Sequence, residues 1–565
     1  MRILLATAVL VMSAPAFAQA AEEDSQTGIA DIVVTARKAS ENLQSVPVAV
    51  TALDTEALAS RQVFEVTDLA RTAPSLTIST GGTGPASIVY LAIRGQAQNS
   101  PNSLSDTSVG IYIDGVYVAR PIVGNLGFLD LASAEVLRGP QGTLFGRNTT
   151  GGALNLTTNQ PKLGASEGSI KLGLGNYSQR VIEGVVNVPL GEEAAARFAG
   201  RYHERDGYFP NAIAGYPQGS VDTDYVMRGT LRYEPSAVPL KFTITGEYVK
   251  YKDDGNATAV AAINPAVLSL PSYGAFINSE FSRFVTAAQL PSFTAANSDW
   301  KDTFSKPRSG DSEIDTLANK NKVKSTSATI EWDAGGVDIK SITAYRTSLT
   351  SDSLDLQGVP STAVASSPPI AFFQACVAGV PSLLAACQGA FGPNPGPTIL
   401  AAVSPYIPTL TNASSGFVST YKNKQFSQEL QLSGTTGKLD YQTGLYYFKE
   451  SGTEQSRAFV FGGIASARTL SGYSSQSLGA FAQLNYHATD ALRLTAGLRY
   501  TWDKRFIDRR STNDWRLPDD LEKCTVGANT GKTAAQAPCT APSNAKFDYP
   551  AWTFGADYRV SDQLF

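Results

Sequence analysis

Histidine and cysteine side chains, which serve as metal ligands and redox groups, are few in this chain. The two histidines, His203 and His487, lie far apart in the sequence. The four cysteines form two close pairs, Cys376 with Cys387 and Cys524 with Cys539. Each pair lies in a stretch rich in proline, glycine and alanine, where an exported protein would form a local disulfide. A zinc site is the alternative, but neither histidine is near a cysteine pair, so we predict two disulfides and no metal site.

Residues that could carry out enzyme chemistry do not form a recognisable motif. No Gly-x-Ser-x-Gly nucleophile motif with supporting context stands out. The glycine-rich run 139–152 could bind phosphate, but it lacks the Gly-Lys-Ser/Thr ending of a phosphate-binding loop. Gly139 and Pro140 favour a turn instead, and Glu135 can pair with Arg138 across one short element. We therefore predict that the chain is not an enzyme and needs no cofactor.

The N-terminus and the composition predict an exported protein. Residues 1–20 begin with Met1 and Arg2, continue through the apolar stretch 3–12 and end near small residues, which is typical of a secretory signal. A membrane anchor is the alternative, but this apolar stretch is shorter than the ~20 residues that a spanning helix needs. The formal net charge of −4 argues against nucleic acid as a partner.

From about residue 168 onward, long segments alternate between apolar and polar residues, as at 240–248, 439–447 and 492–502. Such segments form strands with one apolar and one polar face. A soluble β-sandwich would also alternate, but segments of about ten residues or more that finish in aromatic residues favour a membrane barrel. No later segment offers about 18 uninterrupted apolar residues, so a membrane-embedded chain would have to use strands.

The connections between these segments are of two kinds. Tight turns are expected at 434–438 and 489–490, and the longest loops are expected at about 253–320, 351–422 and 505–545. Loops of that length usually carry function, so we expect them to face outward and meet the ligand.

The alternation gives about 12 strands between Gly168 and Tyr558. It stops at Phe565 before the last strand pattern is finished. An open sheet in lipid leaves backbone groups unpaired, so we predict an incomplete barrel. A small complete barrel is the alternative.

Residues 44–161 have a mixed pattern that predicts a small α+β domain. Helices are expected at 55–61 and 66–72. Strands are expected at 47–51, 88–93, 108–118 and 153–157. Before this domain, residues 31–38 form a β-prone island, which is either the domain's first strand or a segment that a partner protein captures by edge pairing.

Two runs within this domain resemble the plug domain of TonB-dependent receptors. Residues 108–117 read SVGIYIDGVY, and residues 129–155 read LDLASAEVLRGPQGTLFGRNTTGGALN. The resemblance extends over the signal, the plug and the barrel strands. It implies an all-β transmembrane antiparallel barrel of the 22-stranded type, of which about 12 strands are present, with the α+β plug inside its lumen. The implied parts are a signal peptide at 1–20, a periplasmic tail at 21–43, the plug at 44–161 and a partial barrel at 162–565.

The resemblance also implies sites. Residues 31–38 would be the TonB box, the periplasmic handle of the receptor, and its candidate residues are Asp31, Ile32, Val33, Val34, Thr35 and Ala36. Glu135 and Arg138 would tie the plug to the barrel wall, and a local salt bridge explains them equally. The stretches 81–86 and 96–105 would be apical loops that touch substrate, and flexible linkers explain their composition equally. The candidate contact residues are Gly82, Thr83, Gln96, Asn99 and Asn102.

The function that this resemblance implies is active uptake across the outer membrane of a Gram-negative bacterium. The TonB–ExbB–ExbD complex would grip the box and use the proton gradient of the inner membrane, and outer-membrane lipid would surround the barrel. We expect a ferric siderophore or related iron chelate as the ligand, with oligosaccharides, cobalamin and aromatic compounds as alternatives. The loop aromatics would suit catecholate chelates or could merely pack the loop; they are Tyr273, Phe276, Phe281 and Phe284.

Two other classes of outer-membrane protein fit the sequence less well. A passive porin needs neither a plug nor a box, which residues 31–160 would supply. A signal-transducing receptor of the family carries an extra periplasmic domain before the box, and only a short tail lies between the expected cleavage site and Asp31.

Overall fold

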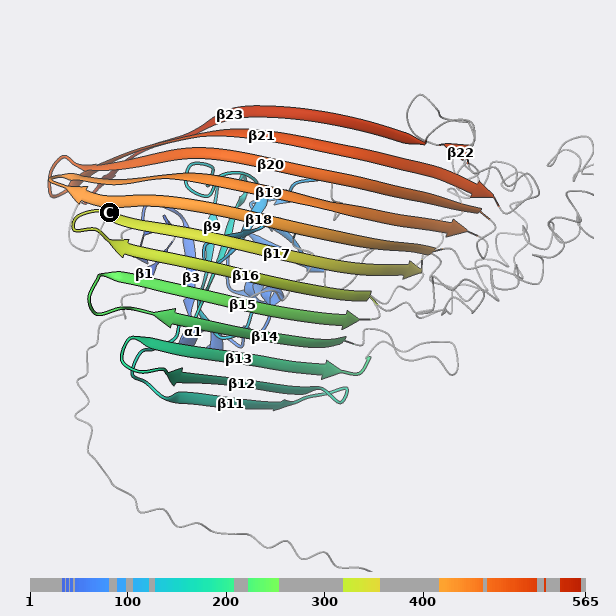
Figure 1. Ribbon diagram of the computed structural model, residues 1–565, viewed down its shortest axis with the longest axis horizontal. Helices are drawn as coiled ribbons and strands as arrows, with labels where there is room; N and C mark the ends of the chain where they lie inside the picture. The colour runs from blue at the N-terminus through green and yellow to red at the C-terminus, as the bar shows by residue number, and fades with distance from the viewer. Residues whose placement is uncertain are drawn as a thin grey trace, which may run out of the picture.

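The computed structural model describes residues 33–35, 37–39, 41–43, 46–80, 89–97, 105–120, 128–207, 222–253, 319–355, 416–460, 465–515, 523–524 and 539–559. These residues form a long curved sheet of antiparallel strands and a small α+β unit, the plug, that lies against one face of the sheet (Figure 1). That face is called the inner face below, and the opposite one the outer face. The fold is the predicted combination of barrel strands and plug.

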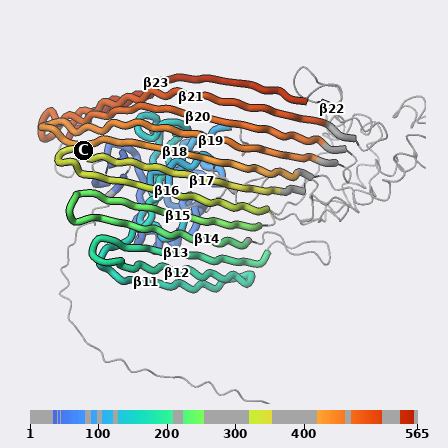
Figure 2. Tube along the Cα trace, in the orientation of Figure 1, coloured from blue at the N-terminus to red at the C-terminus, as the bar shows by residue number. Residues whose placement is uncertain are grey.

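The barrel sheet is a meander in which each strand pairs with the next one in the sequence (Figure 2). β23 pairs with β21, and the two-residue strand β22 also pairs with β21. Apart from β22, the strands agree in number with the predicted set. Their bounds are β11 (Glu167–Leu174), β12 (Arg180–Pro189), β13 (Ala194–Arg205), β14 (Asp222–Tyr233), β15 (Leu240–Asp253), β16 (Asn319–Asp333), β17 (Asp338–Asp355), β18 (Gly416–Thr436), β19 (Leu439–Val460), β20 (Ala465–His487), β21 (Leu492–Trp515), β22 (Lys523–Cys524) and β23 (Thr540–Tyr558).

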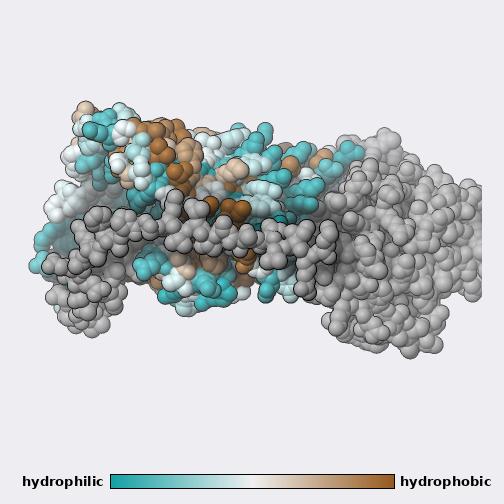
Figure 3. Space-filling view, turned by 90° about the horizontal axis from the view of Figure 1, so that it is seen from below, coloured by the Kyte–Doolittle hydropathy of each residue, from teal (hydrophilic) through white to brown (hydrophobic). Residues whose placement is uncertain are grey.

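The two faces of the sheet differ as the alternation predicts. On β18, Gln425 and Glu429 are buried on the inner face, whereas Phe426 and Leu430 are 37% and 39% exposed on the outer face. Other exposed large apolar residues lie on the outer face of further strands, among them Leu445 on β19 and Leu498 on β21. Hydrophobic residues gather in the middle of the described part, with hydrophilic residues on both sides (Figure 3). The outer face therefore has the apolar band that a membrane-spanning barrel needs.

The plug contains a five-stranded sheet and a three-stranded sheet. The five-stranded sheet has the order β3 (Val50–Asp54), β9 (Leu131–Arg138), β10 (Gly152–Thr158), β7 (Val109–Ile113) and β8 (Val116–Val118), and the smaller sheet has β4 (Leu76–Thr80), β5 (Val89–Ile93) and β6 (Gln96–Ala97). The helix α1 (Thr55–Ser60) begins where the Asp54 side chain accepts a hydrogen bond from the Ala57 N–H, and the 3₁₀-helix η2 (Val66–Arg71) follows. A separate two-stranded sheet pairs β1 (Val33–Val34) with β2 (Glu41–Asn42).

The hydrophobic core joins the plug to the strand wall. Leu69, Ile93 and Leu154 are fully buried in the plug, and the same apolar cluster includes Val226 on β14 and Val249 on β15. The plug and these strands therefore share one hydrophobic core. Burial of shared apolar surface is one reason why the plug stays against the inner face.

Two glycines of the run 139–152 adopt conformations that other residues rarely adopt. Gly146 has φ +84°, and a Cβ there would lie 2.7 Å from Arg499 Cζ. Gly152 has φ +153°, and a Cβ there would lie 2.2 Å from the carbonyl oxygen of Leu137 on β9. These glycines allow close approach to the barrel wall and to the neighbouring strand.

Several element boundaries differ from those predicted. The expected strand 108–118 is two strands, β7 and β8, separated by a turn at Asp114 and Gly115 with φ 49° and 78°. The loops expected at 351–422 and 505–545 were drawn too long, because β17 continues to Asp355, β18 begins at Gly416 and β21 continues to Trp515. Polar residues at these strand ends do not alternate with apolar ones, so the pattern gave no signal for a strand. Among the described residues, no helix is both long and apolar enough to cross a membrane.

The predicted disulfides are described only in part. Cys539 is buried and disulfide-bonded. Its pairing with Cys524 stays a prediction. Cys376 and Cys387 lie outside the described residues, as do the expected signal peptide at 1–20 and the loop aromatics from Tyr273 to Phe284.

Candidate coupling segment and substrate pocket

The N-terminal segment, which comprises β1, β2 and the described residues between them, lies between the plug and the barrel wall. Its two strands pair in antiparallel register, Val33 with Asn42 and Val34 with Glu41. The Val34 side chain is fully buried in an apolar cluster that includes Leu137 of the plug and Phe481 of β20. The segment is therefore packed on two sides rather than extended into solvent.

A buried carboxylate of the plug holds the segment at Thr35. Glu135 on β9 accepts hydrogen bonds from the Thr35 N–H at 2.8 Å and from the Thr35 hydroxyl at 3.0 Å. Asn155 on β10 donates to the Thr35 hydroxyl at 2.9 Å and to Glu135 at 3.3 Å. Burial raises the pKa of Glu135, and the hydrogen bonds from Thr35 and Asn155 oppose that rise. Buried polar groups are costly without partners, so this cluster depends on the segment being in place.

Lys38 ties the same segment to the barrel wall. It lies in a turn closed by the hydrogen bond from the Lys38 N–H to the Thr35 carbonyl at 2.9 Å. Its ammonium group forms an ion pair with Glu429 on β18 and lies 5.6 Å from the ring centre of Phe145 and 5.3 Å from that of Phe481. Burial lowers the pKa of Lys38, and Glu429 opposes that effect.

A second contact with the wall comes from Arg37. Its guanidinium pairs with Glu41 within the segment, and Arg37 Nη1 donates to Asn485 Oδ1 on β20 at 3.3 Å. Lys38 and Arg37 together attach the segment to β18 and β20.

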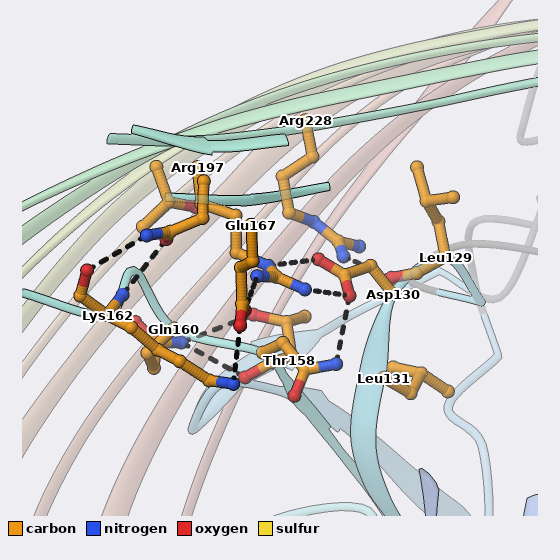
Figure 4. Close-up of polar contacts among 12 residues, drawn as sticks. Leu129, Asp130, Leu131, Thr158, Gln160, Lys162, Glu167, Arg197 and Arg228 are labelled. Carbon is orange, nitrogen blue, oxygen red and sulfur yellow. Dashed lines mark hydrogen bonds and ion pairs between the residues drawn. The ribbon is translucent and has the colours of Figure 1, made fainter. Parts of the chain in front are cut away.

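Arginines of the barrel hold the opposite side of the plug (Figure 4). Arg197 on β13 donates to both carboxylate oxygens of Asp130, at 2.6 and 2.7 Å. Arg228 on β14 donates to the Leu129 carbonyl at 2.5 Å, and Arg201 on β13 donates to the Phe128 carbonyl at 3.0 Å. This group, the arginine anchor, holds the chain directly before β9. Bidentate arginine contacts of this kind fix position as well as adding energy.

The arginine anchor continues into the connection between the plug and β11. Asn159 donates to Asp130 at 2.9 Å, and Arg197 also donates to Glu167 at 3.1 Å. Lys162 in turn lies 3.0 Å from Glu167 (Figure 4). The anchor therefore lies where the plug joins the barrel in the sequence, whereas the N-terminal segment lies at the other end of the plug sequence.

A cavity of about 620 Å³ lies between the plug and strands β20, β21 and β23. This cavity lies in the half of these strands that is far from the short turn 488–491. In that half, Tyr473 on β20 pairs with Ile507 on β21. Its lining combines charged, hydroxyl and aromatic side chains: Asp106, Arg120, Asn148, Tyr473, Ser475, Asp503, Arg505, Phe506, Phe547 and Tyr549. We call this cavity the upper pocket.

Ion pairs between the plug and the wall organise the floor of the upper pocket. Arg120 binds Glu450 on β19 through two hydrogen bonds of 2.6 and 3.0 Å. Asp106 pairs with Arg147 of the plug at 3.3 Å and also with Arg505 on β21. Burial alone would raise the pKa of Asp106, but Arg147 and Arg505 outweigh burial and lower it. The pocket thus contains cationic groups whose present partners are carboxylates that an anionic ligand could replace.

A smaller cavity of about 270 Å³ lies closer to the short turns. It extends from Thr35 and Lys38 of the N-terminal segment, past Asp114, to the hydroxyl groups of β15 and β16. Those hydroxyl groups belong to Thr243, Thr245, Ser327 and Thr329. The N-terminal segment therefore borders a polar space between the plug and the wall.

Comparison with protein families matches both parts of the chain. Residues 42–153 match the TonB-dependent receptor plug domain. Residues 269–565, more than half of the chain, match the β-barrel of TonB-dependent receptors. The chain belongs to the TonB-dependent receptor family. Its fold and family place it in the outer membrane, as predicted.

Individual relatives are similar over part of their length. The pesticin receptor of Yersinia pestis is 33% identical over 159 residues, which are 28% of this chain and 22% of that protein. The iron-regulated outer membrane virulence protein of Vibrio cholerae is 30% identical over 161 residues, which are 27% of this chain and 23% of that protein. The chain thus covers less than a quarter of the length of either curated relative.

Solved TonB-dependent receptors share the fold. The ferric yersiniabactin uptake receptor from Yersinia pestis superposes with a TM-score of 0.62 at 16% identity, over 91% of this chain and 62% of that one. The open form of the ferric-catecholate import receptor from E. coli superposes with a TM-score of 0.60 at 14% identity, over 92% of this chain and 69% of that one.

The expected TonB box is described at three of its six candidate residues. Val33, Val34 and Thr35 lie in the N-terminal segment, whereas Asp31, Ile32 and Ala36 lie outside the described residues. The role of these residues as the TonB box stays a prediction.

The other site residues expected from the sequence are placed as follows. Glu135 forms its hydrogen bonds with Thr35 and Asn155, and Arg138 Nε has no hydrogen-bond partner among the described residues. Contact of Glu135 and Arg138 with the barrel wall stays a prediction. Gln96 is exposed on β6, and the other expected apical residues lie outside the described part of the chain, namely Gly82, Thr83, Asn99 and Asn102.

No pattern in the sequence pointed to the residues that form the arginine anchor or the ion pair of Lys38 with Glu429. Asp130 is 67 residues away from its partner Arg197, and Lys38 is 391 residues away from its partner Glu429. The alternation predicts that a polar side chain on a barrel strand lies on the inner face, and it predicts nothing more. Which plug group it meets depends on the position of the plug.

Replacement of Thr35 by valine should loosen the N-terminal segment. Thr35→Val keeps the shape but leaves Glu135 and Asn155 short of a buried hydrogen-bond partner, at a cost of about 1–3 kcal/mol. We expect faster hydrogen exchange at the amides of residues 33–43 in the detergent-solubilised protein. The control is Thr77→Val, at an exposed position on β4, which should leave that exchange unchanged. Equal protection in wild type and Thr35→Val would contradict the role given to the hydroxyl.

Loss of the Asp130 contact should release the other side of the plug. The side chains of Arg197 and Asp130 are 11% and 8% exposed. Arg197→Gln therefore leaves the buried Asp130 carboxylate without its main partner, which should lower the stability of the plug by about 3 kcal/mol or more. The measurement is the urea concentration at which plug residues become sensitive to protease. The matched control is Arg71→Gln, which breaks an exposed pair with Asp68 and should cost less than about 1 kcal/mol. Similar midpoints for the two variants would contradict the arginine anchor.

Proposed function

We propose that the protein is a receptor for active uptake of a scarce substrate across the outer membrane, and that the substrate is a ferric siderophore or another iron complex. The observation that carries this proposal is the upper pocket. It lies on the side of the long connections, between plug and wall, and so would receive a ligand from outside the cell. Its arginines and aromatic rings suit an anionic, aromatic or carboxylate-bearing chelate.

Relatives support the choice of iron over other substrates. The similar proteins include an iron-regulated outer membrane protein and receptors for ferric yersiniabactin and ferric catecholates by their own names. Oligosaccharides, cobalamin and aromatic compounds remain the other substrate classes for the same pocket. A passive porin fits poorly, because the plug lies against the inner face and is held there on two sides.

The coupling partner in this proposal is the TonB–ExbB–ExbD complex, which would grip residues 31–38. A strand such as β1 can be captured by a partner strand through main-chain hydrogen bonds. In the structure, the main chain of Val33 and Val34 is already paired with β2. Capture by a partner would therefore require β1 to separate from β2, and the N-terminal segment to give up its contacts with Glu135 and Glu429.

The positions of the two attachments of the plug in the sequence determine the order in which a pull on the N-terminus would break them. A pull on the N-terminus acts first on the N-terminal segment and its contacts with β18 and β20. The arginine anchor lies at the far end of the plug sequence and is loaded only after the intervening strands give way. We infer that the segment detaches first and that the polar space beside Lys38 opens next, while Asp130 stays bound to Arg197.

The test is uptake of an iron-55-labelled ferric siderophore by iron-starved cells that express the protein from its own gene. We compare wild type, a variant lacking residues 31–38, and Arg505→Gln in the upper pocket. Loss of the box should abolish uptake and leave surface binding intact, whereas Arg505→Gln should weaken binding itself. Arg71→Gln, far from both sites, serves as the control and should behave as wild type.

Each other outcome has a defined meaning. Binding without uptake in every strain would reject active transport. No binding of any ferric siderophore would reject the iron substrate and favour the other substrate classes. Equal uptake with and without residues 31–38 would show that these residues are not the coupling handle.

A further inference from the structure

Six exposed lysines on the outer face form a belt across strands β15 to β19 of the barrel sheet. They occupy three neighbouring rows of strands β15 to β19 in the register of the sheet. We call them the lysine belt: Lys250, Lys322, Lys324, Lys422, Lys424 and Lys449. Lys252 and Lys320 pair with each other in the next row.

The lysine belt is on the side of the sheet that faces lipid. Lys322 and Lys324 have the same parity on β16 as Ile330 and Trp332, which are 41% and 46% exposed. Side chains two residues apart on a strand share a face. The same parity joins Lys424 to the exposed Leu430 on β18. None of these lysines therefore points toward the plug or the upper pocket.

The belt lies above the apolar band, toward the outer end of the strands. Lys250 is near the end of β15 at Asp253, and Lys322 is near the start of β16 at Asn319. These strand ends are opposite the short turns, and short turns face the periplasm in outer-membrane barrels. Hydrophilic residues border the apolar band on this side too (Figure 3).

No acidic residue balances the belt on its own face. On β15 to β19, the other outer-face positions of the three rows are glycine, serine, threonine, leucine, tyrosine or phenylalanine. Within the described part of the chain, none of the six lysines forms an ion pair with Asp or Glu. The belt thus concentrates positive charge at one height of the barrel surface.

Aromatic rings support two of the six ammonium groups. Lys250 Nζ lies 5.7 Å from the ring centre of Tyr225, and Lys322 Nζ lies 5.8 Å from that of Tyr248. Tyr225 in turn packs against Tyr202 at 4.9 Å between ring centres. Tyrosine and lysine side chains at this height combine an apolar body with a polar tip, which is typical of a membrane interface.

We propose that the lysine belt binds the phosphate groups of lipid in the outer leaflet of the outer membrane. Unpaired ammonium groups at a membrane interface are favourable next to anionic head groups, and clusters of lysine are a recognised signal for such lipids. The outer leaflet of a Gram-negative outer membrane consists largely of a phosphorylated glycolipid, lipopolysaccharide. Lysines on four strands can bind several phosphates at once, so the belt would fix the height of the barrel in this leaflet.

The test uses the detergent-solubilised full-length protein titrated with fluorescently labelled lipopolysaccharide. The variant Lys322→Glu with Lys422→Glu reverses two charges on either side of Leu349 in one row. The control, Lys241→Glu with Lys438→Glu, makes the same charge change near the short turns. We expect the affinity for lipopolysaccharide to fall roughly tenfold or more in the belt variant, and to change less than about twofold in the control.

Two further measurements identify the ligand chemistry. Dephosphorylated lipopolysaccharide should bind wild type and the belt variant equally weakly, and inorganic phosphate at the same phosphate concentration should not displace the lipid. The proposal is overturned if the belt variant and the control lose the same affinity, if dephosphorylated lipid binds wild type as tightly as the intact lipid, or if inorganic phosphate displaces it. Circular dichroism checks that all variants keep their strand content, and none of these readouts depends on the transported substrate.

Discussion

Every strand in the barrel must share its backbone N–H and C=O groups with a neighbour, because lipid offers no water to replace those hydrogen bonds. Between its edge strands β11 and β23, the meander meets this requirement with long unbroken registers, such as the one from Ala465 with Trp515 to His487 with Arg493. The fixed register sends alternate side chains to opposite faces over the whole sheet. The apolar band, the lysine belt and the polar inner wall all follow from it.

The inner wall in turn determines how the plug is held. Its side chains are polar, so the plug is attached by ion pairs and hydrogen bonds in addition to apolar contact. The arginine anchor uses three guanidinium groups near the plug–barrel junction, with contacts to Asp130 and to the Leu129 carbonyl among them. The N-terminal segment is held by Glu135 of the plug, by the ion pair of Lys38 with Glu429 and by the contact of Arg37 with Asn485. A mechanical load on the N-terminus therefore reaches the contacts of the N-terminal segment first and the arginine anchor second.

The sequence predicted the parts of this structure that depend on local pattern. Alternation predicts the strands and their faces, and the run 129–155 predicts the plug with its glycine turns. Contacts between Lys38 and Glu429 or between Asp130 and Arg197 depend on how the plug is seated, which no local pattern records. Strand ends such as Arg510 to Trp515 on β21 were missed because they carry no apolar alternation. The packing of residues 33–35 between the plug and the barrel wall could not be predicted either, since the same residues would also suit a free strand.

The central claim is that the N-terminal segment detaches separately from the rest of the plug. Single-molecule pulling on the N-terminal side of Val33, with the barrel held in a membrane, tests it most directly. The account predicts a first rupture that lengthens the chain by roughly 60 Å, the extended length of residues 33–50, while the plug strands stay folded. A first rupture of roughly 400 Å, which would release the chain as far as β10 at once, would contradict it.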